Sequence, residues 1–394
     1  MLNQNSHFIL SILTIFLVLP LSLLSKNVNG QIPLRRHLLS HESEHYAVIF
    51  DMQTNPGLSS YETDPKAAAN SLEPLLDEAE GVVPKELQDE TPLELGATAG
   101  LRMLKGDAAE KILQAVAVNY LLGNLGKNYK STTATIDIGG GSIQMACAIS
   151  NEQFANAPKN VEGEPYVLQK HLMSKDYNLY VHSYLNYGQL AGRAEIFKAS
   201  RNESNPCALE GFEGYYSYGG VDYKVKAPKK GSSLKKCRNL TRQALRIKAQ
   251  CKNKNCTFNG VWNGGGGDGQ KTIHASSFFY YIGAQVGIVD TKFPSVLAKP
   301  IQYLNAAKVA CKTKATDVKS VFPQTQDKNV PYLCMDLVYQ YTLLVDGFGL
   351  NPYKDITVMN KVQYKSYQIK AAWPLGCAID LVSSTSNKIR VSSS

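Results

Sequence analysis

The chain has 394 residues, of which 44% are hydrophobic and 19% are charged. This composition excludes an intrinsically disordered chain, and the length is sufficient for two packed lobes. The formal charge of +9 is spread along the chain, apart from short lysine clusters at residues 226–230 and 235–236. These clusters could attract an anionic nucleotide or a cell-wall surface, but a solvated basic face is the simpler interpretation.

An apolar run near the N-terminus predicts a secretory signal peptide over residues 1–30, and hence a secreted, extracellular (apoplastic) protein. Residues 8–24 are apolar but short and interrupted by Pro20, which disfavours a membrane span. Small residues at 28–30 supply a cleavage site before Gln31. The alternative is an uncleaved anchor that would hold the protein on a membrane. The sequence contains no second apolar run of spanning length.

Secretion predicts oxidised cysteines, and the chain has eight cysteines. Their spacing favours three disulfides, although it leaves the connectivity open: Cys207–Cys237, Cys251–Cys256 and Cys311–Cys334. Cys147 and Cys377 would then remain as buried thiols. A zinc site at the Cys251–Cys256 pair is disfavoured, because no histidine pair follows at ligand spacing. Three sequons predict a glycosylated surface region: those at Asn202, Asn239 and Asn255.

Strands alternate with helices in the first third of the chain. A short apolar strand at residues 46–50 is expected to end on Asp51. A helix then begins at Thr63-Asp64-Pro65, with a capping side chain, a proline in its first turn and a stripe of apolar residues: Ala68, Leu72, Leu75 and Leu76. A second strand at residues 93–97 precedes a helix that Asp107 caps. That helix runs to about residue 122 and ends at Gly123 or Gly126. Such alternation predicts an α/β sheet with ligand sites at its switch points.

A second lobe is expected from residue 132 onward. Residues 132–136 are β-branched and predict a buried strand. Residues 170–259 combine a helical stretch with a cysteine region rich in tyrosine, lysine and glycine. Residues 273–289 predict an apolar helical segment, and residues 366–381 carry a β-like run followed by a Trp-Pro-Leu-Gly turn.

The segment Thr135–Gln144, TIDIGGGSIQ, has the pattern of a phosphate-binding turn. Glycines after a strand can take positive φ and bring backbone N–H groups close to a phosphate with no Cβ in the way. Asp137 can hold a cation directly or through water, since cations that bridge phosphates use one or two carboxylates plus waters. A glycine-rich turn can also be an ordinary tight bend, so other motifs must decide.

Four further segments carry a family resemblance: LELGATAGLRMLKGDAAEKILQAV (93–116), NYLLGNLGK (119–127), FNGVWNGGGGDGQ (258–270) and AAWPLGCAIDL (371–381). They occur in the order found in apyrases. From Tyr46 to the C-terminus the chain resembles the secreted plant apyrases. These belong to the ecto-nucleoside triphosphate diphosphohydrolases, which remove terminal phosphates from nucleoside tri- and diphosphates.

The resemblance implies an α/β fold of two ribonuclease-H-like lobes, as in actin and hexokinase, with a nucleotide cleft between them. Residues 45–118 and 366–394 would form the first lobe and residues 119–365 the second. The resemblance also implies hydrolysis of ATP and ADP with Ca or Mg as cofactor. The expected partners are nucleoside tri- and diphosphates and no nucleic acid, and the expected state is a monomer.

The resemblance further implies roles for individual residues. Ser142 and Gln144 match positions that place the nucleophilic water, while Asp51 and Asp137 are the expected cation residues, acting through water. The expected nucleotide-binding residues are Gly139, Gly140, Gly141, Ser142, Gln144, Thr98, Gly265 and Gly266. Gly264 to Gly267, with Asp268, match the fifth motif, and four glycines are costly enough to order that a site role is favoured over a plain loop. The alternative role for Ser142 is a helix N-cap, and Arg102 of the second motif could instead be structural.

Two segments depart from the family pattern. After Asp51 an apyrase has a Gly-Ser-Thr-Gly-Ser phosphate loop and two further strands, whereas this chain has a turn at Pro56-Gly57. Within residues 113–120 the family has a segment ending in Asp-Gly-Thr-Gln-Glu-Gly, whose glutamate is the catalytic base, and this chain lacks it. Glu94 and Glu110 do not lie in that context. The first lobe is therefore expected to be incomplete, with unpaired backbone beside residues 46–50. Exon skipping or an incomplete gene model is the favoured explanation, because the flanking sequence matches.

Nucleotide phosphate hydrolysis is the leading functional hypothesis, and a catalytically impaired nucleotide or glycan binder is the alternative. A sugar kinase of the same superfamily is disfavoured because residues 92–102 match apyrases. A serine hydrolase is disfavoured because residues 140–144 lack the second glycine of the nucleophile elbow. Phosphate release from ATP and ADP would separate the two leading hypotheses.

Overall fold

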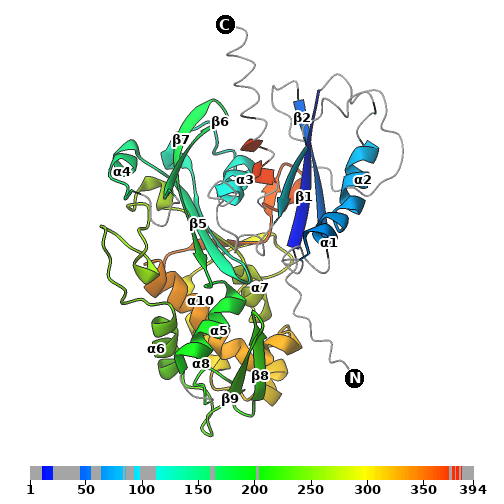
Figure 1. Cartoon of the computed structure of the whole chain (residues 1–394). Helices are drawn as coiled ribbons and strands as arrows, with labels where there is room; N and C mark the ends of the chain where they lie inside the picture. Colours follow the sequence, from blue (N-terminus) through cyan, green and yellow to red (C-terminus); the bar gives the residue numbers. More distant parts are fainter. Residues whose placement is uncertain are drawn as a thin grey trace. The chain divides into compact units, whose positions relative to one another are not determined.

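The chain divides into two compact units in a computed structural model (Figure 1). The structure describes residues 11–20, 45–54, 64–82, 85, 93–97, 112–159, 165–200, 204–371, 375–377, 379, 380 and 383. Unit 1 comprises residues 1–120, 170–177 and 371–394, and unit 2 comprises residues 121–169 and 178–370.

Unit 1 contains a three-stranded antiparallel sheet in the order β2-β1-β3. Its strands are β1 (Ser11–Pro20), β2 (His45–Thr54) and β3 (Leu93–Ala97). Strand β1 lies in the middle and pairs with β2 along its whole length, from Ser11 opposite Thr54 to Pro20 opposite His45. The apolar run expected to be a signal peptide is therefore the central strand of this sheet.

One expectation for the first strand is wrong: strand β2 continues through Asp51 to Thr54 instead of ending at Asp51. The expectation of unpaired backbone beside residues 46–50 holds on one side. Strand β2 pairs with β1 but is the edge strand of this sheet, so its other side has no partner among the described residues. The apolar run of β1, which has high β propensity, satisfies the backbone groups on the side of β2 and of β3 that faces it.

Three helices of unit 1 follow local sequence signals: α1 (Pro65–Asn70), α2 (Glu73–Val82) and α3 (Leu113–Leu121). The Asp64 side chain caps α1 by accepting a hydrogen bond from the Ala67 N–H at 2.9 Å, as expected. The single predicted helix is broken at residues 71–72 into α1 and α2. Helix α3 ends before Gly123, whose φ of +65° stops it, whereas Asp107 and the predicted helix start lie outside the described residues.

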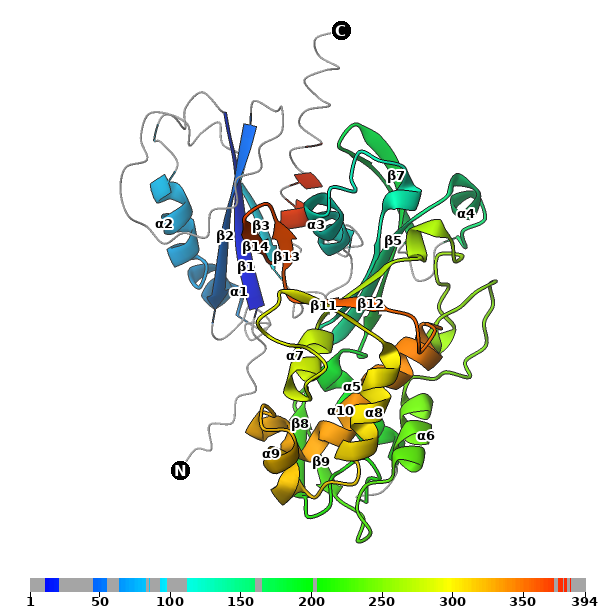
Figure 2. The same ribbon diagram turned by 180° about the vertical axis from the view of Figure 1, so that it is seen from behind.

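Unit 2 is built on a seven-stranded sheet in the order β11-β12-β10-β4-β5-β7-β6 (Figure 2). Its strands are β4 (Ala134–Ile138), β5 (Ser142–Ile149), β6 (Val167–Leu172), β7 (Lys175–Leu185), β10 (Ile273–Ser277), β11 (Ser295–Ala298) and β12 (Ile356–Met359). Strands β4, β5 and β7 form an antiparallel meander, while β10 and β12 continue the sheet parallel to β4. This is the mixed order of a ribonuclease-H-like lobe.

Helices pack on this sheet and complete the core of unit 2. They are α4 (Asn151–Ala155), α5 (Gln189–Ser200), α6 (Leu234–Ala244), α7 (Phe278–Gln285), α8 (Pro300–Ala310), α9 (Val318–Val321) and α10 (Leu333–Thr342). Every residue of α10 is buried, and α10 packs against α5, α6 and α8. Two hairpins complete the unit: β8 (Glu213–Tyr218) with β9 (Val221–Lys226), and β13 (Val362–Tyr364) with β14 (Tyr367–Ile369).

The prediction of a single helical segment over residues 273–289 is wrong. The structure has strand β10 followed directly by helix α7, and the two meet at Ser277, whose φ is +60°. Hydrophobicity alone cannot separate a buried strand from a buried helix. The position of β10 between β4 and β12 decides in favour of a strand for its first half.

All three predicted disulfides are confirmed: Cys207–Cys237, Cys251–Cys256 and Cys311–Cys334. The last of these links the end of α8 to α10. Cys147 and Cys377 lie buried outside these pairs, as expected. The sequon residues Asn239 and Asn255 are exposed, whereas Asn202 lies outside the described residues.

In the part of the chain that the structure describes, no helix has both the length and the hydrophobicity needed to cross a membrane.

Removing residues 1–30 should loosen the sheet of unit 1 and leave the sheet of unit 2 unchanged. Strands β2 and β3 both pair with β1, so a chain beginning at Gln31 loses the only neighbour that the described residues give each of them. Hydrogen exchange should become faster in β2 and β3, while β4 and β5 keep their protection. Equal protection of β2 in both chains would contradict the pairing with β1.

Candidate functional site

The turn Gly139–Gly141 joins β4 to β5 and is fastened by its carbonyl oxygens. The N–H groups of Gln189, Leu190 and Asn186 donate to the carbonyls of Gly139, Gly140 and Gly141, at 2.8, 3.0 and 2.9 Å respectively. None of the three glycines has its φ in the positive range, so this turn does not use the left-handed conformation that is open to glycine. Among the described residues, the N–H groups of Gly140 and Gly141 have no acceptor. The turn therefore presents unused donors, which is what an anion requires.

A glycine that sequence analysis missed allows this turn to form. Gly188 lies against the turn so closely that an added Cβ would stand 2.4 Å from the Ser142 nitrogen and 2.5 Å from the Gly140 carbonyl carbon. Both neighbours are backbone atoms and cannot move aside. Its position directly before a helix, next to Gln189, is the sequence signal that could have identified it.

The structure brings Ser142 and Gln144 together at the start of β5. Both residues are buried, and the Gln144 Nε2 donates to Ser142 Oγ at 2.6 Å and to Ser183 Oγ of β7 at 3.2 Å. The two side chains lie on one face of the strand because they are two residues apart. The alternative that Ser142 caps a helix is wrong, since it begins a strand.

Asp137 lies beside this pair on β4. Its Oδ1 accepts hydrogen bonds from Ser276 Oγ at 2.7 Å and from Ser277 Oγ at 2.5 Å, both on β10. Strand register places Ser276, Asp137, Gln144 and Ser183 in one row across four strands. The row lies at the carboxyl ends of the parallel strands β4 and β10, where ligands bind in open α/β sheets. The serines of β10 were missed by sequence analysis, which treated that segment as helix.

The donor set around Asp137 fits a hard divalent cation held largely by water and phosphate. Both serine contacts use the Oδ1 of Asp137, and Oδ2 accepts no hydrogen bond from the described residues. The described residues contain no group of three or more His, Cys, Asp or Glu side chains that could hold a metal ion. Mg²⁺ typically binds through one or two carboxylates together with substrate phosphates and waters.

The structure describes only some of the remaining expected site residues. The backbone of Asp51 lies in β2, and its side chain is outside the description, as are Thr98 and Arg102. Gly265 and Gly266 lie near α4: the Gln153 side chain donates to the Gly266 carbonyl. Helix α4 follows the far end of β5, and a strand of that length spans roughly 24 Å. The structure therefore places the fifth-motif glycines away from the Gly139–Gly141 turn.

A buried ion pair anchors the helix behind the turn. Arg193 of α5 contacts Asp336 of α10 through two hydrogen bonds, Nε to Oδ1 at 2.8 Å and Nη2 to Oδ2 at 2.5 Å. Although burial opposes its charge, the neighbouring Asp336 raises the pKa of Arg193. Gln189 Nε2 also donates to Asp336 Oδ1, at 2.9 Å. Because the Gln189 backbone N–H holds the Gly139 carbonyl, the ion pair supports the turn through one residue.

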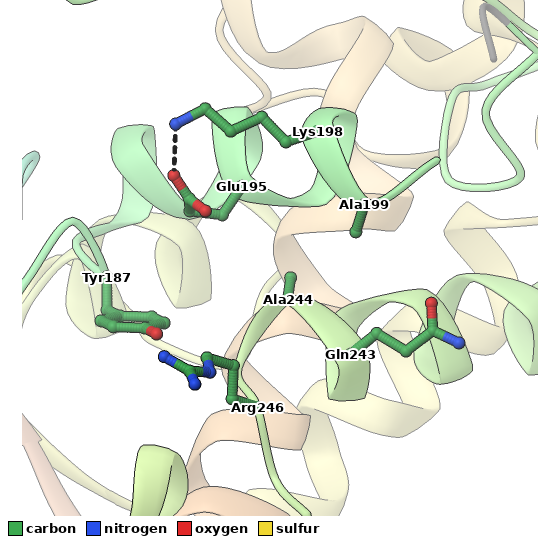
Figure 3. A pocket seen from close by; sticks show the side chains of 7 residues that line it. All are labelled: Tyr187, Glu195, Lys198, Ala199, Gln243, Ala244 and Arg246. Atoms are coloured by element: carbon green, nitrogen blue, oxygen red, sulfur yellow. Dashed lines mark hydrogen bonds and ion pairs between the residues drawn. The ribbon is translucent and has the colours of Figure 1, made fainter. Parts of the chain in front are cut away.

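An open groove lies between α5 and α6 and includes Tyr187, which directly precedes Gly188 (Figure 3). It has a volume of about 860 Å³ and is lined by Tyr187, Glu195, Lys198, Ala199, Gln243, Ala244 and Arg246. Lys198 Nζ is paired with Glu195 Oε1 at 2.6 Å, as Figure 3 shows. This pairing neutralises the lysine and leaves Arg246 as the remaining cation of the lining.

His274 is a buried titratable group on the same strand as Ser276. Burial lowers its pKa to about 4, and its Nδ1 is hydrogen-bonded to Thr133 Oγ1 at 2.8 Å. The neutral form therefore predominates at physiological pH. No hydrogen bond connects its ring to Asp137 or Gln144, so we interpret it as a core residue.

An anion-binding turn beside a single carboxylate is suited to a phosphorylated ligand held with a cation. In agreement with this geometry, the chain belongs to the GDA1/CD39 (nucleoside phosphatase) family, whose model matches residues 36–118 and 115–394.

Relatives in plants are similar over most or all of the chain. The chain is 74% identical to "Apyrase" of Solanum tuberosum over 454 aligned positions that cover all of both chains. It is 47% identical to "Nucleoside-triphosphatase" of Pisum sativum, with 83% of this chain and 79% of that protein covered. Among solved structures, nucleoside triphosphate hydrolases from Neospora caninum match 71% of this chain and 64% of theirs, at 12% identity and a TM-score of 0.45.

Replacing Gly188 with alanine should destabilise unit 2 by about 1–3 kcal/mol, since the added Cβ meets backbone atoms of the turn. Urea unfolding measures the loss. Gly81→Ala is the matched control: Gly81 is exposed in α2, an added Cβ meets nothing within 4 Å there, and stability should be unchanged or slightly raised. Equal stability of Gly188→Ala and the wild type would refute the close approach.

Replacing His274 with asparagine should flatten the decline of stability in acid. Its pKa is about 4 in the folded chain and 6.5 ordinarily, so the unfolded chain binds the proton more readily between these values. The stabilisation by neutral His274 is complete above about pH 6.5 and is lost as the pH falls towards 4. At pH 5 the free energy of unfolding should already be lower by about 2 kcal/mol than at neutral pH because of this group. Unfolding at pH 7 and pH 5 tests this, with His171→Asn on an exposed strand position as control. An unchanged pH dependence in His274→Asn would contradict the assignment.

Proposed function

We propose that this protein is an apyrase-type phosphohydrolase that removes terminal phosphates from nucleoside tri- and diphosphates such as ATP and ADP. The observation that carries the proposal is a pair of hydrogen-bonded side chains, Ser142 and Gln144, with Asp137 opposite Gln144 on the neighbouring strand. They lie beside the Gly139–Gly141 turn, in which the N–H groups of Gly140 and Gly141 have no acceptor among the described residues. Membership of a nucleoside phosphatase family and the names of the plant relatives support the same activity.

Each of these residues has a proposed part in the reaction. The N–H groups of Gly140 and Gly141 bind a phosphate oxygen, while Ser142 and Gln144 orient the attacking water. The hydrogen bond between these two side chains fixes their rotamers, so that the water meets a preorganised pair of polar groups. A divalent cation, Ca or Mg, would neutralise phosphate charge, and Asp137 would hold it directly or through water. Gly265 and Gly266 are left out of this site because of their position.

We also propose the cellular setting and domain organisation that the sequence indicates. The chain is secreted through a signal peptide at residues 1–30, glycosylated at its sequons and monomeric. The three disulfides and the exposed Asn239 and Asn255 support a luminal route. Residues 45–118 with 366–394, and residues 119–365, are the proposed lobes, with Thr98 and Asp51 contributing to the nucleotide site from the first.

A second candidate function is nucleotide binding with little turnover. The alignment with the Solanum tuberosum relative extends over 454 positions, whereas this chain has 394 residues, so at least 60 positions of that alignment are empty in this chain. The family match also restarts at residues 115–118, where the glutamate segment was expected. Both observations support the absence of catalytic segments.

Phosphate release from ATP and ADP should be at least about 10⁴-fold slower for this chain than for a version with both family segments restored. A general base typically contributes about 10²–10⁴-fold, and a preorganised donor about 10²–10³-fold, although such effects need not add. The assay compares both proteins with Ca or Mg.

Comparable rates would refute the idea that the missing glutamate and loop matter. In the restored protein, Ser142→Ala combined with Gln144→Ala should abolish the gain in activity. Activity that survives this double change would remove these two residues from the proposed mechanism.

A further inference from the structure

The β8–β9 hairpin is fixed to the same segment that holds the glycine turn. Gly219 and Gly220, with φ of +59° and +75°, form its two-residue turn. The Tyr216 hydroxyl donates to the Leu190 carbonyl at 2.7 Å. The Leu190 N–H in turn donates to the Gly140 carbonyl, so one residue joins the hairpin to the turn. Strand β8 also packs against α5 (Figure 1).

This anchoring places the Tyr218 hydroxyl at the glycine turn. Tyr218 is two residues beyond Tyr216 and therefore lies on the same face of β8. A Cβ built on Gly141 would stand 3.2 Å from the Tyr218 hydroxyl oxygen. Tyr215, on the opposite face, is 65% exposed. The hairpin thus presents one tyrosine to the turn and another to solvent.

Two neighbouring hydrogen-bond donors at this point have no acceptor in the part of the chain that the structure describes. The Tyr218 hydroxyl makes no hydrogen bond with the described residues, and neither does the Gly141 N–H. Burial raises the pKa of Tyr218, with Lys198 opposing and Glu195 adding to the shift, so the phenol keeps its proton. A protonated phenol beside a backbone N–H is suited to an oxygen that carries negative charge.

We propose that the Tyr218 hydroxyl donates a hydrogen bond to a phosphate oxygen of the nucleotide bound at the Gly139–Gly141 turn. Tyr218 is then a substrate-binding residue contributed by the β8–β9 hairpin, in addition to the row on the sheet. This inference rests on the proposed function, because it takes the ligand of the turn to be a nucleotide phosphate.

The test measures binding, so that it does not depend on turnover. The probe is adenosine 5′-(β,γ-imido)triphosphate with Ca, titrated calorimetrically into the full chain. Tyr218→Phe should weaken binding by about tenfold or more, since it removes a single hydrogen bond to a charged group. Tyr215→Phe, the same change on the exposed face, should bind as the wild type does. Thermal unfolding of each variant checks the fold.

The outcomes separate this inference from the proposed function. Binding by Tyr218→Phe within twofold of wild type, with a clear loss in Ser142→Ala plus Gln144→Ala, would overturn the role of Tyr218 alone. No loss in either variant, or no binding by the wild type, would overturn the nucleotide site together with this inference. Equal losses in Tyr218→Phe and Tyr215→Phe would also overturn it, because the face of the hairpin would not matter.

A double-mutant cycle checks the geometry without any nucleotide. Gly141→Ala should lower stability because its Cβ approaches the Tyr218 hydroxyl, and the loss should be smaller in a Tyr218→Phe background, which lacks that oxygen. Strictly additive effects would show that the hydroxyl is not at the turn and would overturn the proposal.

Discussion

The described part of the site depends on three backbone hydrogen bonds that fasten the Gly139–Gly141 turn to residues 186–190. These bonds occupy the three carbonyl oxygens of the turn, while the N–H groups of Gly140 and Gly141 have no acceptor among the described residues. The same close approach excludes a side chain at Gly188 and brings the Tyr216 anchor within one residue of the turn. The contact between the Gly139–Gly141 turn and residues 186–190 therefore determines three things: the free N–H groups of the turn, the position of α5 and the position of the β8–β9 hairpin.

The energetic support for this arrangement lies deeper in unit 2. The Arg193–Asp336 pair is almost fully buried, and such a pair costs desolvation that only good hydrogen-bond geometry offsets. Gln189 completes the geometry by adding a third hydrogen bond to the carboxylate. Asp336 lies two residues from the disulfide that links α8 to α10. Loss of one partner would leave a buried charge next to the segment that holds the turn.

Unit 1 shows how the same residues can satisfy different physical demands. An apolar run followed by small residues meets the requirements of a secretory signal. It also meets those of a central β-strand, since it is apolar and rich in β-branched residues, and the structure pairs it with both β2 and β3. In the intact chain β1 is the strand that pairs with β2 and with β3. Cleavage before Gln31 would remove that partner, so processing and the stability of this sheet are coupled.

Local sequence determined a large part of this protein. Asp64 with a following proline predicted the start of α1, the spacing of cysteines predicted all three disulfides, and the β-branched residues before the three glycines predicted β4. These features depend on a few neighbouring residues or on spacing within one region. The family motif likewise predicted roles for Asp137, Ser142 and Gln144, and these residues lie together in the structure. Tertiary structure decided the rest. Residues 273–277 form strand β10 because they pair between β4 and β12, and this pairing places Ser276 beside Asp137. The roles of Gly188 and Tyr218 arise from contacts with residues about 46 to 77 positions away, and such contacts leave no trace in local sequence patterns.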